Sequence, residues 1–288
     1  MKQTNEAYYN IAGMTIRVVS DLEITPNTFR REFDSFEAEE LLEDVITLYH
    51  HFAYPANMSR EGTVLYNRTP WEIYETDSFY KYLMVWPDRT IKRYAEFTKD
   101  YREGHIYHES DELWKEGNLN ALTTFQSDQI LLAVLLADRE GFYLHSAAAI
   151  LAGEGYIFAG HSEAGKTTMS NMVRQHGEIL CDDRNIVRKI DGKWKVYGTW
   201  SHGDLDEVLG ESVPINGVYF LHQAPENRIE PMADKGKAAC AVLSLVVKGI
   251  TSRDWWQKTV CAAETFVKDN NFYNLYFDKS GKIVQKFM

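Results

Sequence analysis

A short segment in the second half of the chain constrains the local fold more than any other feature of the sequence. Gly160–Thr167 reads Gly-His-Ser-Glu-Ala-Gly-Lys-Thr and fits the pattern G-x-x-x-x-G-K-[ST]. The glycines let the backbone turn tightly, so that successive N–H groups can point at phosphate oxygens. The apolar stretch Tyr156–Ala159 predicts the strand that must precede such a loop. Lys166–Gln175 predicts the helix that must follow, with Gly177 as its C-terminal glycine.

The loop pattern assigns an expected role to each position. Lys166 can reach the β- and γ-phosphates, and the hydroxyl of Thr167 can bind Mg²⁺. A carboxylate beside a triphosphate would be repelled, so we expect Glu163 to point to solvent or to contact a partner or substrate. The pattern therefore predicts binding of ATP or GTP with Mg²⁺. The residues expected to contact the nucleotide are Gly160, His161, Ser162, Glu163, Ala164, Gly165, Lys166, Thr167 and Thr168.

Two acidic residues follow the predicted helix. Glu178–Cys181 reads as a short strand that ends at Asp182 and Asp183. Successive strand residues point to opposite faces, so the two carboxylates need not do the same job. One can coordinate Mg²⁺ and the other can accept the proton of an attacking hydroxyl. We expect βαβ packing to place this strand beside the strand that carries the loop.

His145 is a further candidate for the site. It lies in Phe142–Leu151, which reads as the first arm of a hairpin that turns at Gly153–Gly155. The second arm carries the loop, so His145 can lie near the phosphates. A single histidine on a strand is also commonly structural, and both alternatives stay open at this point.

The composition narrows the class of partner. The chain of 288 residues has a net charge of −11, which disfavours nucleic acid and anionic membranes as partners. Its longest apolar run, Ile130–Ala137, is far short of the roughly 18 residues that span a bilayer. The N-terminal stretch lacks the apolar core of a signal peptide. Cys181, Cys240 and Cys261 show no CxxC spacing and predict buried free thiols, hence a cytoplasmic protein.

The first 120 residues predict a separate domain. Ile11–Val19, Thr63–Tyr66 and Tyr80–Trp86 read as strands, and the apolar spacing of Phe36–His51 predicts a helix. We therefore expect a β-rich α+β domain over residues 1–120, of unknown role, and a second domain over 121–288, joined at the loop Gly117–Asn120.

Histidines and aromatic residues in the first domain form recognisable sets. The pairs His50–His51 and His105/His108 are expected to be surface or packing residues, because no third ligand accompanies either pair. The aromatic residues are expected to serve core and edge-strand packing, with a surface for adenine or a peptide as the alternative. This aromatic set consists of Tyr66, Trp71, Tyr74, Tyr80, Tyr82 and Trp86.

The second half of the chain resembles the HPr kinase/phosphorylase and phosphoenolpyruvate carboxykinase superfamily, in particular the HPr-kinase-like proteins of unassigned substrate. The resemblance rests on His145–Ala149, the loop and Leu180–Asp183, and it covers roughly residues 125–288. Val218–Leu221, Asn227–Pro231 and Tyr273–Phe277 are similar too. It implies an α/β, P-loop-containing domain with a mixed sheet and flanking helices. It also implies a homo-oligomer, although no residue pattern demands one.

The resemblance also implies roles for single residues. In that family the histidine that matches His145 lies at the active site, and the serine that matches Ser162 contacts the phosphates. The aspartate that matches Asp182 acts as base or acid in phosphoryl transfer, and the one that matches Asp183 helps to hold the metal. Asn185–Tyr197, a predicted hairpin, stands where the HPr kinases carry their signature segment. HPr and oxaloacetate are therefore not the expected substrates.

Three further residues have two interpretations each: His202, Asp204 and Arg228 either line the site or are ordinary loop residues. Three functions remain for the chain. The first is an ATP- and Mg²⁺-dependent kinase that acts on a hydroxyl of a peptide, a protein or a small molecule. The second is a nucleotide-gated binding or regulatory module without turnover. The third, which the sequence favours least, is a carboxykinase-like lyase. A kinase needs a base and a binding module does not, so the paired aspartates favour the kinase.

Overall fold

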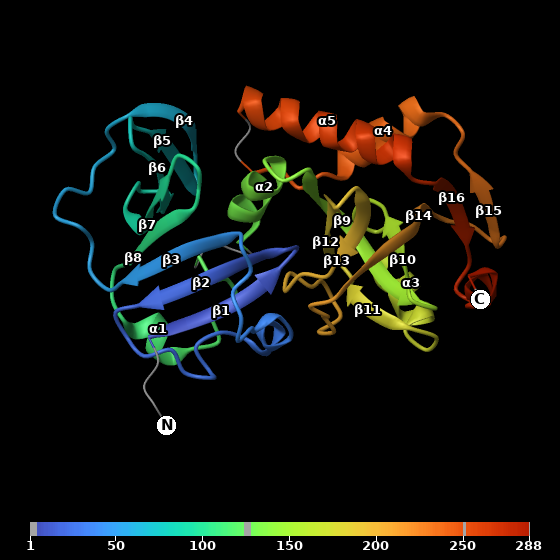
Figure 1. Cartoon of the computed structure of the whole chain (residues 1–288), viewed down its shortest axis with the longest axis horizontal. Coiled ribbons are helices and arrows are strands. Elements are labelled where there is room, and N and C mark those ends of the chain that lie inside the picture. Colours follow the sequence, from blue (N-terminus) through green and yellow to red (C-terminus); the bar gives the residue numbers. More distant parts are fainter. Residues whose placement is uncertain (1–4, 124–127, 250–251, 288) are drawn as a thin grey trace. The chain divides into compact units, whose positions relative to one another are not determined.

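The computed structural model describes residues 5–123, 128–249 and 252–287. The chain divides into two compact units, Met1–Asp128 and Gln129–Met288 (Figure 1). The sequence-based division lies near residue 120, whereas the structural one follows Asp128. No helix among the described residues is long and apolar enough to cross a membrane.

The first unit is built on one eight-stranded sheet in the order β1-β2-β3-β8-β7-β6-β5-β4. Most neighbours are antiparallel, but β3 runs parallel to both β2 and β8. A 3₁₀-helix, η1 (Arg31–Phe36), and a short helix, α1 (Glu112–Glu116), accompany the sheet. The strands are β1 (Glu6–Ile11), β2 (Met14–Ser20), β3 (Val45–His51), β4 (Thr63–Arg68), β5 (Trp71–Glu75), β6 (Phe79–Val85), β7 (Ile91–Thr98) and β8 (Glu103–His108).

One prediction for this unit is only partly right, and another is wrong. Ile11–Val19 is not one strand, because Ala12 and Gly13 both adopt positive φ and turn the chain into the β1–β2 hairpin. Phe36–His51 is not a helix: η1 ends at its first residue and its last seven form β3. Leu41 and Leu42, which supplied part of the helical spacing, are exposed. Strands on both sides of β3 supply its backbone hydrogen bonds, and this tertiary pairing outweighs the local helical pattern.

The histidine and aromatic sets of this unit take mixed positions. His50 Nδ1 lies 2.9 Å from His108 Nε2 in the core, and His51 Nε2 lies 3.0 Å from His105 Nδ1 nearer the surface. Of the aromatic set, Tyr74 and Tyr82 are buried, whereas Tyr66 and Trp86 are exposed. Core packing therefore accounts for only part of the aromatic set.

The second unit is α/β with a mixed sheet, and this class is the predicted one. Its strands follow the order β10-β9-β12-β13-β14-β16-β15, with β11 on β9 and an added parallel pairing of β10 with β14. The strands are β9 (Gly141–Leu151), β10 (Glu154–Ala159), β11 (Glu178–Cys181), β12 (Arg184–Ile190), β13 (Lys193–Tyr197), β14 (Ser212–Gln223), β15 (Arg228–Pro231) and β16 (Phe272–Phe277). The helices are α2 (Gln129–Ala137), α3 (Lys166–Val173), α4 (Lys235–Leu245), α5 (Arg253–Asp269) and the 3₁₀-helix η3 (Lys282–Lys286).

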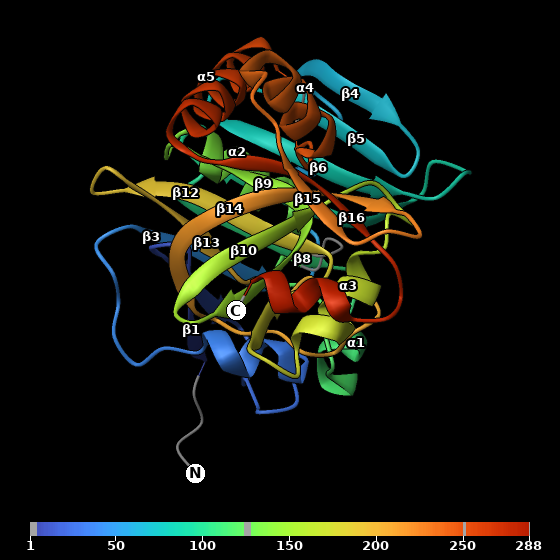
Figure 2. The ribbon, with the colours of Figure 1, turned by 90° about the vertical axis from the view of Figure 1, so that its right-hand side faces the viewer.

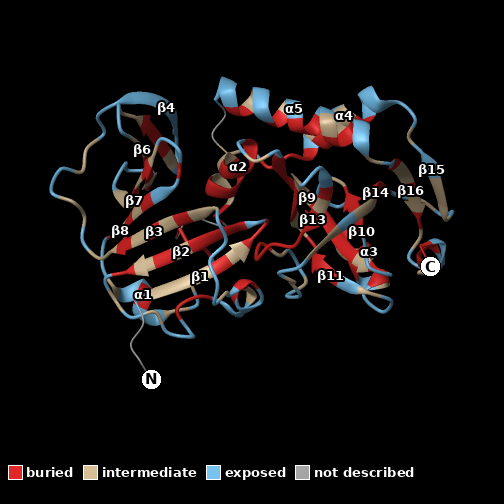
Figure 3. Cartoon of the chain, in the orientation of Figure 1, coloured by how far each residue is buried: buried red, intermediate tan, exposed pale blue. Residues whose placement is uncertain are grey.

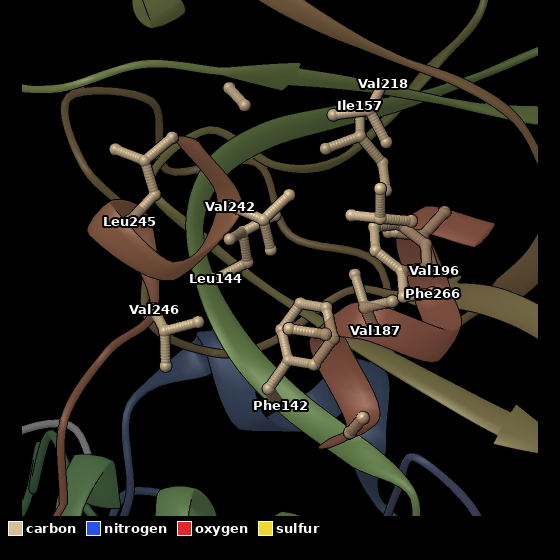
Figure 4. Close-up of a cluster of buried hydrophobic side chains, with 14 of the residues drawn as sticks. Phe142, Leu144, Ile157, Val187, Val196, Val218, Val242, Leu245, Val246 and Phe266 are labelled. Atoms are coloured by element: carbon tan, nitrogen blue, oxygen red, sulfur yellow. The ribbon is translucent and has the colours of Figure 1, made fainter. Parts of the chain in front are cut away.

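The sheet of this unit is covered on both faces (Figure 2). On one face α2, α4 and α5 pack against residues such as Phe142, Leu144 and Ile157 (Figure 4). On the other face α3 and η3 pack against Phe158, next to Ile157 in β10. Adjacent strand residues point to opposite faces, so a strand buried on both faces is apolar throughout. The exposed residues of α4 and α5 lie away from the sheet (Figure 3).

Several local predictions for this unit need correction. The helix expected from Phe125 begins at Gln129 in the structure, and the four residues 124–127 lie outside the described residues. Cys181 is buried as predicted, but Cys240 and Cys261 are exposed on α4 and α5. The predicted hairpin at Asp191–Gly192 is confirmed by the antiparallel pair β12–β13.

The strand after the loop helix does not lie beside the loop strand. β11 pairs with β9, on the side of β9 away from β10, and β14 occupies the other edge of β10. Gly177 is not a helix-terminating glycine either, because α3 ends at Val173. A Cβ at Gly177 would lie 2.1 Å from the carbonyl oxygen of Ile150, so glycine there permits the close approach of β11 to β9.

Candidate functional site

The predicted phosphate loop lies at the carboxyl end of a parallel set of strands. β10 runs parallel to β14, which runs parallel to β16, and the loop begins as β10 ends. Ligands of open α/β sheets bind at this kind of edge. A Cβ at Gly165 would lie 2.7 Å from Phe277 Cζ, and its φ of +103° disfavours other residues. Both glycines are required, since a Cβ at Gly160 would lie 2.5 Å from that of Ala164.

A contact from β14 holds the middle of the loop. Gln223 Nε2 donates to the carbonyl oxygen of Glu163 at 2.7 Å. The side chain of Glu163 is exposed, which is compatible with the expectation that it points to solvent. Nothing in the sequence pairs these two positions, which lie far apart along the chain. The loop is thus fixed by its neighbour strand as well as by its own glycines.

Lys166, the first residue of α3, folds back into the loop. Its Nζ donates to the carbonyl oxygens of Gly160 at 3.2 Å and His161 at 3.3 Å, and it lies 2.9 Å from His145 Nε2. Burial lowers the pKa of Lys166, although the charges of Asp183 and Asp182 oppose this effect. The ammonium group is therefore held inside the loop, within reach of any phosphate that the loop binds.

His145 connects Lys166 to the second aspartate. Its Nδ1 lies 3.1 Å from Asp183 Oδ1, because His145 on β9 is the register partner of Arg184, the residue after Asp183. An ammonium group can only donate, so His145 Nε2 accepts and Nδ1 carries the proton. The result is a hydrogen-bonded chain from Asp183 through neutral His145 to Lys166.

Asp183 is stabilised as an anion. Burial by itself would raise the pKa of Asp183, but the hydrogen bond from His145 and the nearby charges of Arg184 and Lys166 outweigh burial. The pKa of Asp183 therefore lies below its ordinary value. Arg184 Nη1 lies 3.2 Å from Asp183 Oδ2 and donates to Ser201 Oγ at 3.0 Å. Arg184 was not predicted for the site, and no loop or strand pattern marks it.

Asp182 is almost completely buried, with 1% of its surface exposed. Its Oδ1 accepts from the backbone N–H of Gly203 at 2.6 Å, and its Oδ2 accepts from those of Asp204 at 3.1 Å and Leu205 at 3.2 Å. Thr167 Oγ1 lies 3.4 Å from the same Oδ2. Backbone donors to both oxygens stabilise the charged form of a buried carboxylate.

The structure places His202, Asp204 and Arg228, for which the sequence left two interpretations, in different surroundings. Asp204 joins the site, because its Oδ2 lies 3.4 Å from Thr167 Oγ1. His202 contacts its own loop through the carbonyl oxygen of Gly203 at 3.1 Å. Arg228 pairs with Glu226 and Glu230 around β15 and lies 3.8 Å from the ring centre of Tyr276, and these contacts are outside the site.

The chemistry of these oxygens fits Mg²⁺ bound with a nucleotide. Among the described residues, no group of three or more His, Cys, Asp or Glu side chains could hold a metal by itself. Mg²⁺ in phosphate-transfer sites needs only one or two carboxylates, with phosphate oxygens and water completing its shell. The hydroxyl of Thr167 and the carboxylates of Asp182 and Asp204 could supply such ligands, whereas the oxygens of Asp183, the other expected ligand, contact His145 and Arg184.

The comparisons with known proteins assign the chain to a family. The family model described as "SynChlorMet cassette protein ScmC" matches residues 116–283. The chain belongs to this family. No curated protein matches it. The HPr(Ser) kinase/phosphatase from Coxiella burnetii is a similar solved structure, with 9% identity and a TM-score of 0.28 over 50% of this chain and 95% of that one.

The match to the HPr(Ser) kinase/phosphatase is too weak to carry an argument about fold or activity. Membership of the HPr kinase superfamily therefore stays a prediction. What the structure contributes is the arrangement of this chain's own residues. It places His145, Lys166, Thr167, Asp182 and Asp183 within one network of contacts.

Proposed function

We propose that this protein is an ATP- and Mg²⁺-dependent phosphotransferase that acts on a hydroxyl group. The observation that carries the proposal is the chain Asp183–His145–Lys166, which meets the loop where Thr167 faces Asp182. A lysine, a hydroxyl, carboxylates and a potential base converge at the start of one helix. Phosphoryl transfer needs these groups for positioning and for charge stabilisation.

The loop and its lysine bind the phosphates. No side chain caps the N-terminus of α3 among the described residues, so its first N–H groups can serve phosphate oxygens. Lys166 neutralises charge on the β- and γ-phosphates. Thr167 and Asp182, with Asp204 beside them, would hold Mg²⁺. The metal supplies further charge neutralisation on the transferring group.

The geometry favours His145 rather than Asp182 as the group that takes the proton. Both oxygens of Asp182 already accept backbone N–H groups, whereas His145 Nε2 accepts from the ammonium group of Lys166, which a bound phosphate can attract instead. When Lys166 turns to the phosphates, the lone pair on His145 Nε2 becomes available to an acceptor hydroxyl. Asp183 on Nδ1 then stabilises the imidazolium that forms. The resemblance gives this role to Asp182, so the two assignments make different predictions.

A nucleotide-gated module without turnover is the second candidate. Residues 203–205 cover Asp182 through three backbone N–H groups. Asp182 and Thr167 would both have to turn toward a bound Mg²⁺, and the hydrogen bonds that Asp182 accepts link any such change to this segment. The segment can therefore respond to the nucleotide even without transfer. No contact among the described residues favours the lyase.

Binding and turnover separate these possibilities. Calorimetry with Mg-ATP and Mg-GTP measures binding, and ADP or GDP formation is followed with and without pooled peptides that carry Ser, Thr or Tyr. Lys166→Ala should weaken binding at least about tenfold, because it removes a charged phosphate contact. Lys237→Ala, an exposed lysine on α4, is the matched control.

Measurements of phosphoryl transfer by variants then identify the residue that acts as the general base. His145→Asn should keep binding and lower transfer by about 10²–10⁴, the range of general-base effects. Asp182→Asn should instead weaken the dependence of binding on Mg²⁺. If His145→Asn transferred the phosphoryl group normally and Asp182→Asn did not, Asp182 would be the general base. Binding without turnover under every condition would support the module.

A further inference from the structure

A groove beside α3 lies outside the network described above. Its volume is about 560 Å³, within the usual range of small-molecule sites. One wall is a flank of α3, and the other is the segment that leads into η3 together with Lys282 and Gln285 of η3. The lining residues used below are Thr168, Met172, Gln175, His176, Lys279 and Lys282.

The groove begins where the phosphate loop ends. Thr168 is the residue after Thr167 in the loop pattern and lines the groove. Lys166 and Thr167 face His145 and Asp182, so they mark the end at which the γ-phosphate would lie. The α-phosphate must then lie toward another flank of the helix start. The groove opens from that start along α3 toward His176.

We infer that this groove binds the nucleoside, the base with its ribose, of the nucleotide held by the loop. The inference rests on the proposed function and adds a binding subsite to it. A nucleoside leaves the α-phosphate in a fixed direction, and on the described surface this groove is continuous with Thr168. The groove therefore decides which nucleotide the site accepts.

The chemistry of the lining matches that occupant. Met172 and His176 offer a thioether and a ring against which a base can pack. The amide of Gln175 can donate to and accept from the base edge or the ribose hydroxyls. Lys279 and Lys282 bring positive charge to one wall of the groove in a chain whose net charge is −11, which favours the approach of an anionic ligand such as a nucleotide.

The second wall of the groove, the segment that leads into η3, is fixed by contacts within the chain itself. Ile283 and Val284 are buried in the same core as Met169 of α3. The turn ahead of them is fixed by Asp278, which accepts from Ser280 Oγ at 2.5 Å and from Ser280 N at 2.9 Å. Hydrogen bonds from the side chains of Ser280 and Asn227 and from the backbone of Ser280 lower the pKa of Asp278 to about 2. A preformed wall reduces the cost of ordering the site on binding.

Two ligands test the groove separately from the loop. Inorganic tripolyphosphate with Mg²⁺ can contact only the loop, whereas Mg-ATP and Mg-GTP also carry a nucleoside. Calorimetry measures both classes of ligand on the full chain. The double variant Met172→Ala/His176→Ala should lose about tenfold or more in nucleotide affinity, as expected for loss of base packing. Its tripolyphosphate affinity should stay within about twofold of wild type.

A charge variant supplies a second measurement that does not disturb packing. Lys282 is exposed, and Lys282→Ala should weaken nucleotide binding more than Lys286→Ala, an exposed neighbour outside the groove. Nucleotide affinity unchanged in both groove variants, with tripolyphosphate bound normally, would overturn the groove assignment and leave the proposed function intact. Failure of the wild type to bind either ligand would overturn the proposed function itself.

Discussion

Replacing the buried Asp182 with asparagine keeps the size of the side chain and removes its charge, so the effect of the charge on stability can be predicted. In Asp182→Asn, one of two acceptor oxygens becomes an NH₂ group. The better orientation keeps the oxygen toward the N–H groups of Asp204 and Leu205, and it turns the NH₂ group toward the N–H of Gly203. The substitution thus replaces the 2.6 Å hydrogen bond from Gly203 with two donors that face each other.

The expected cost follows from these contacts. A hydrogen bond to a charged group contributes about 1.5–3 kcal/mol, and a buried N–H without a partner costs about 1–3 kcal/mol. Part of this is recovered because a neutral amide costs less to bury than a carboxylate. We therefore expect Asp182→Asn to lower the free energy of unfolding by about 3 kcal/mol. For a unit of this size, that equals a decrease in Tm on the order of 6–12 °C.

Asp183→Asn is the matched control. Asp183 is more exposed, and its partners His145 and Arg184 are side chains that can turn to water when the charge is removed. Its expected loss is about 1 kcal/mol. Urea unfolding at pH 7, followed by tryptophan fluorescence, measures both variants; Trp200 is buried three positions before the segment that covers Asp182. If Asp182→Asn lost no more stability than Asp183→Asn, the backbone N–H groups would not be stabilising the charge, and the reasoning would be refuted.

Three further predictions concern other parts of the molecule. Gly165→Ala should weaken Mg-ATP binding in calorimetry more than Gly192→Ala, since both have positive φ but only Gly165 would clash, with Phe277. Burial lowers the pKa of His108 to about 4, so the neutral form is kept while the unfolded chain takes up a proton near pH 6.5. Urea unfolding should therefore show stability complete above pH 6.5 and reduced as the pH falls toward 4, with about 3 kcal/mol of the loss from His108, and His108→Asn should lose correspondingly less. Phe266→Ala should cost about 3–5 kcal/mol in the same assay, because the side chain is fully buried between α5 and the sheet, and an unchanged midpoint would contradict this packing.

Local features of the second unit were readable from the sequence. Tyr156–Ala159 is apolar because β10 is buried on both faces, and the glycines of the loop stand where a Cβ would collide. Asp191 and Gly192 both adopt positive φ, which is what their residue types favour in a tight hairpin. The hairpin turn and the close approach of Gly160 to Ala164 depend on residues a few positions apart, so the sequence contains the whole of their cause. The collision at Gly165 involves Phe277, far along the chain, and only the glycine itself was visible in the sequence.

Features that depend on distant partners were not readable. The apolar spacing predicts a helix where Val45–His51 forms a strand, because pairing with β2 and β8 determines its conformation. The position of β11 beside β9 depends on β14 already occupying the edge of β10. Neither Gly203–Leu205 nor Arg184 carries a pattern that points to Asp182 and Asp183, because the donors of the first segment are backbone N–H groups, which every residue except proline has.

The sequence by itself determined which chemical groups the site contains. These are a turn that only glycines allow, a lysine and a hydroxyl at a helix start, and a pair of carboxylates after a short strand. Tertiary structure decided how those groups meet. It brought His145 between Lys166 and Asp183, covered Asp182 with a segment of backbone, and left a groove open from Thr168. The physical reason is that residue type sets what an atom can donate, accept or carry, whereas strand pairing and burial set which atoms lie within 3 Å of each other.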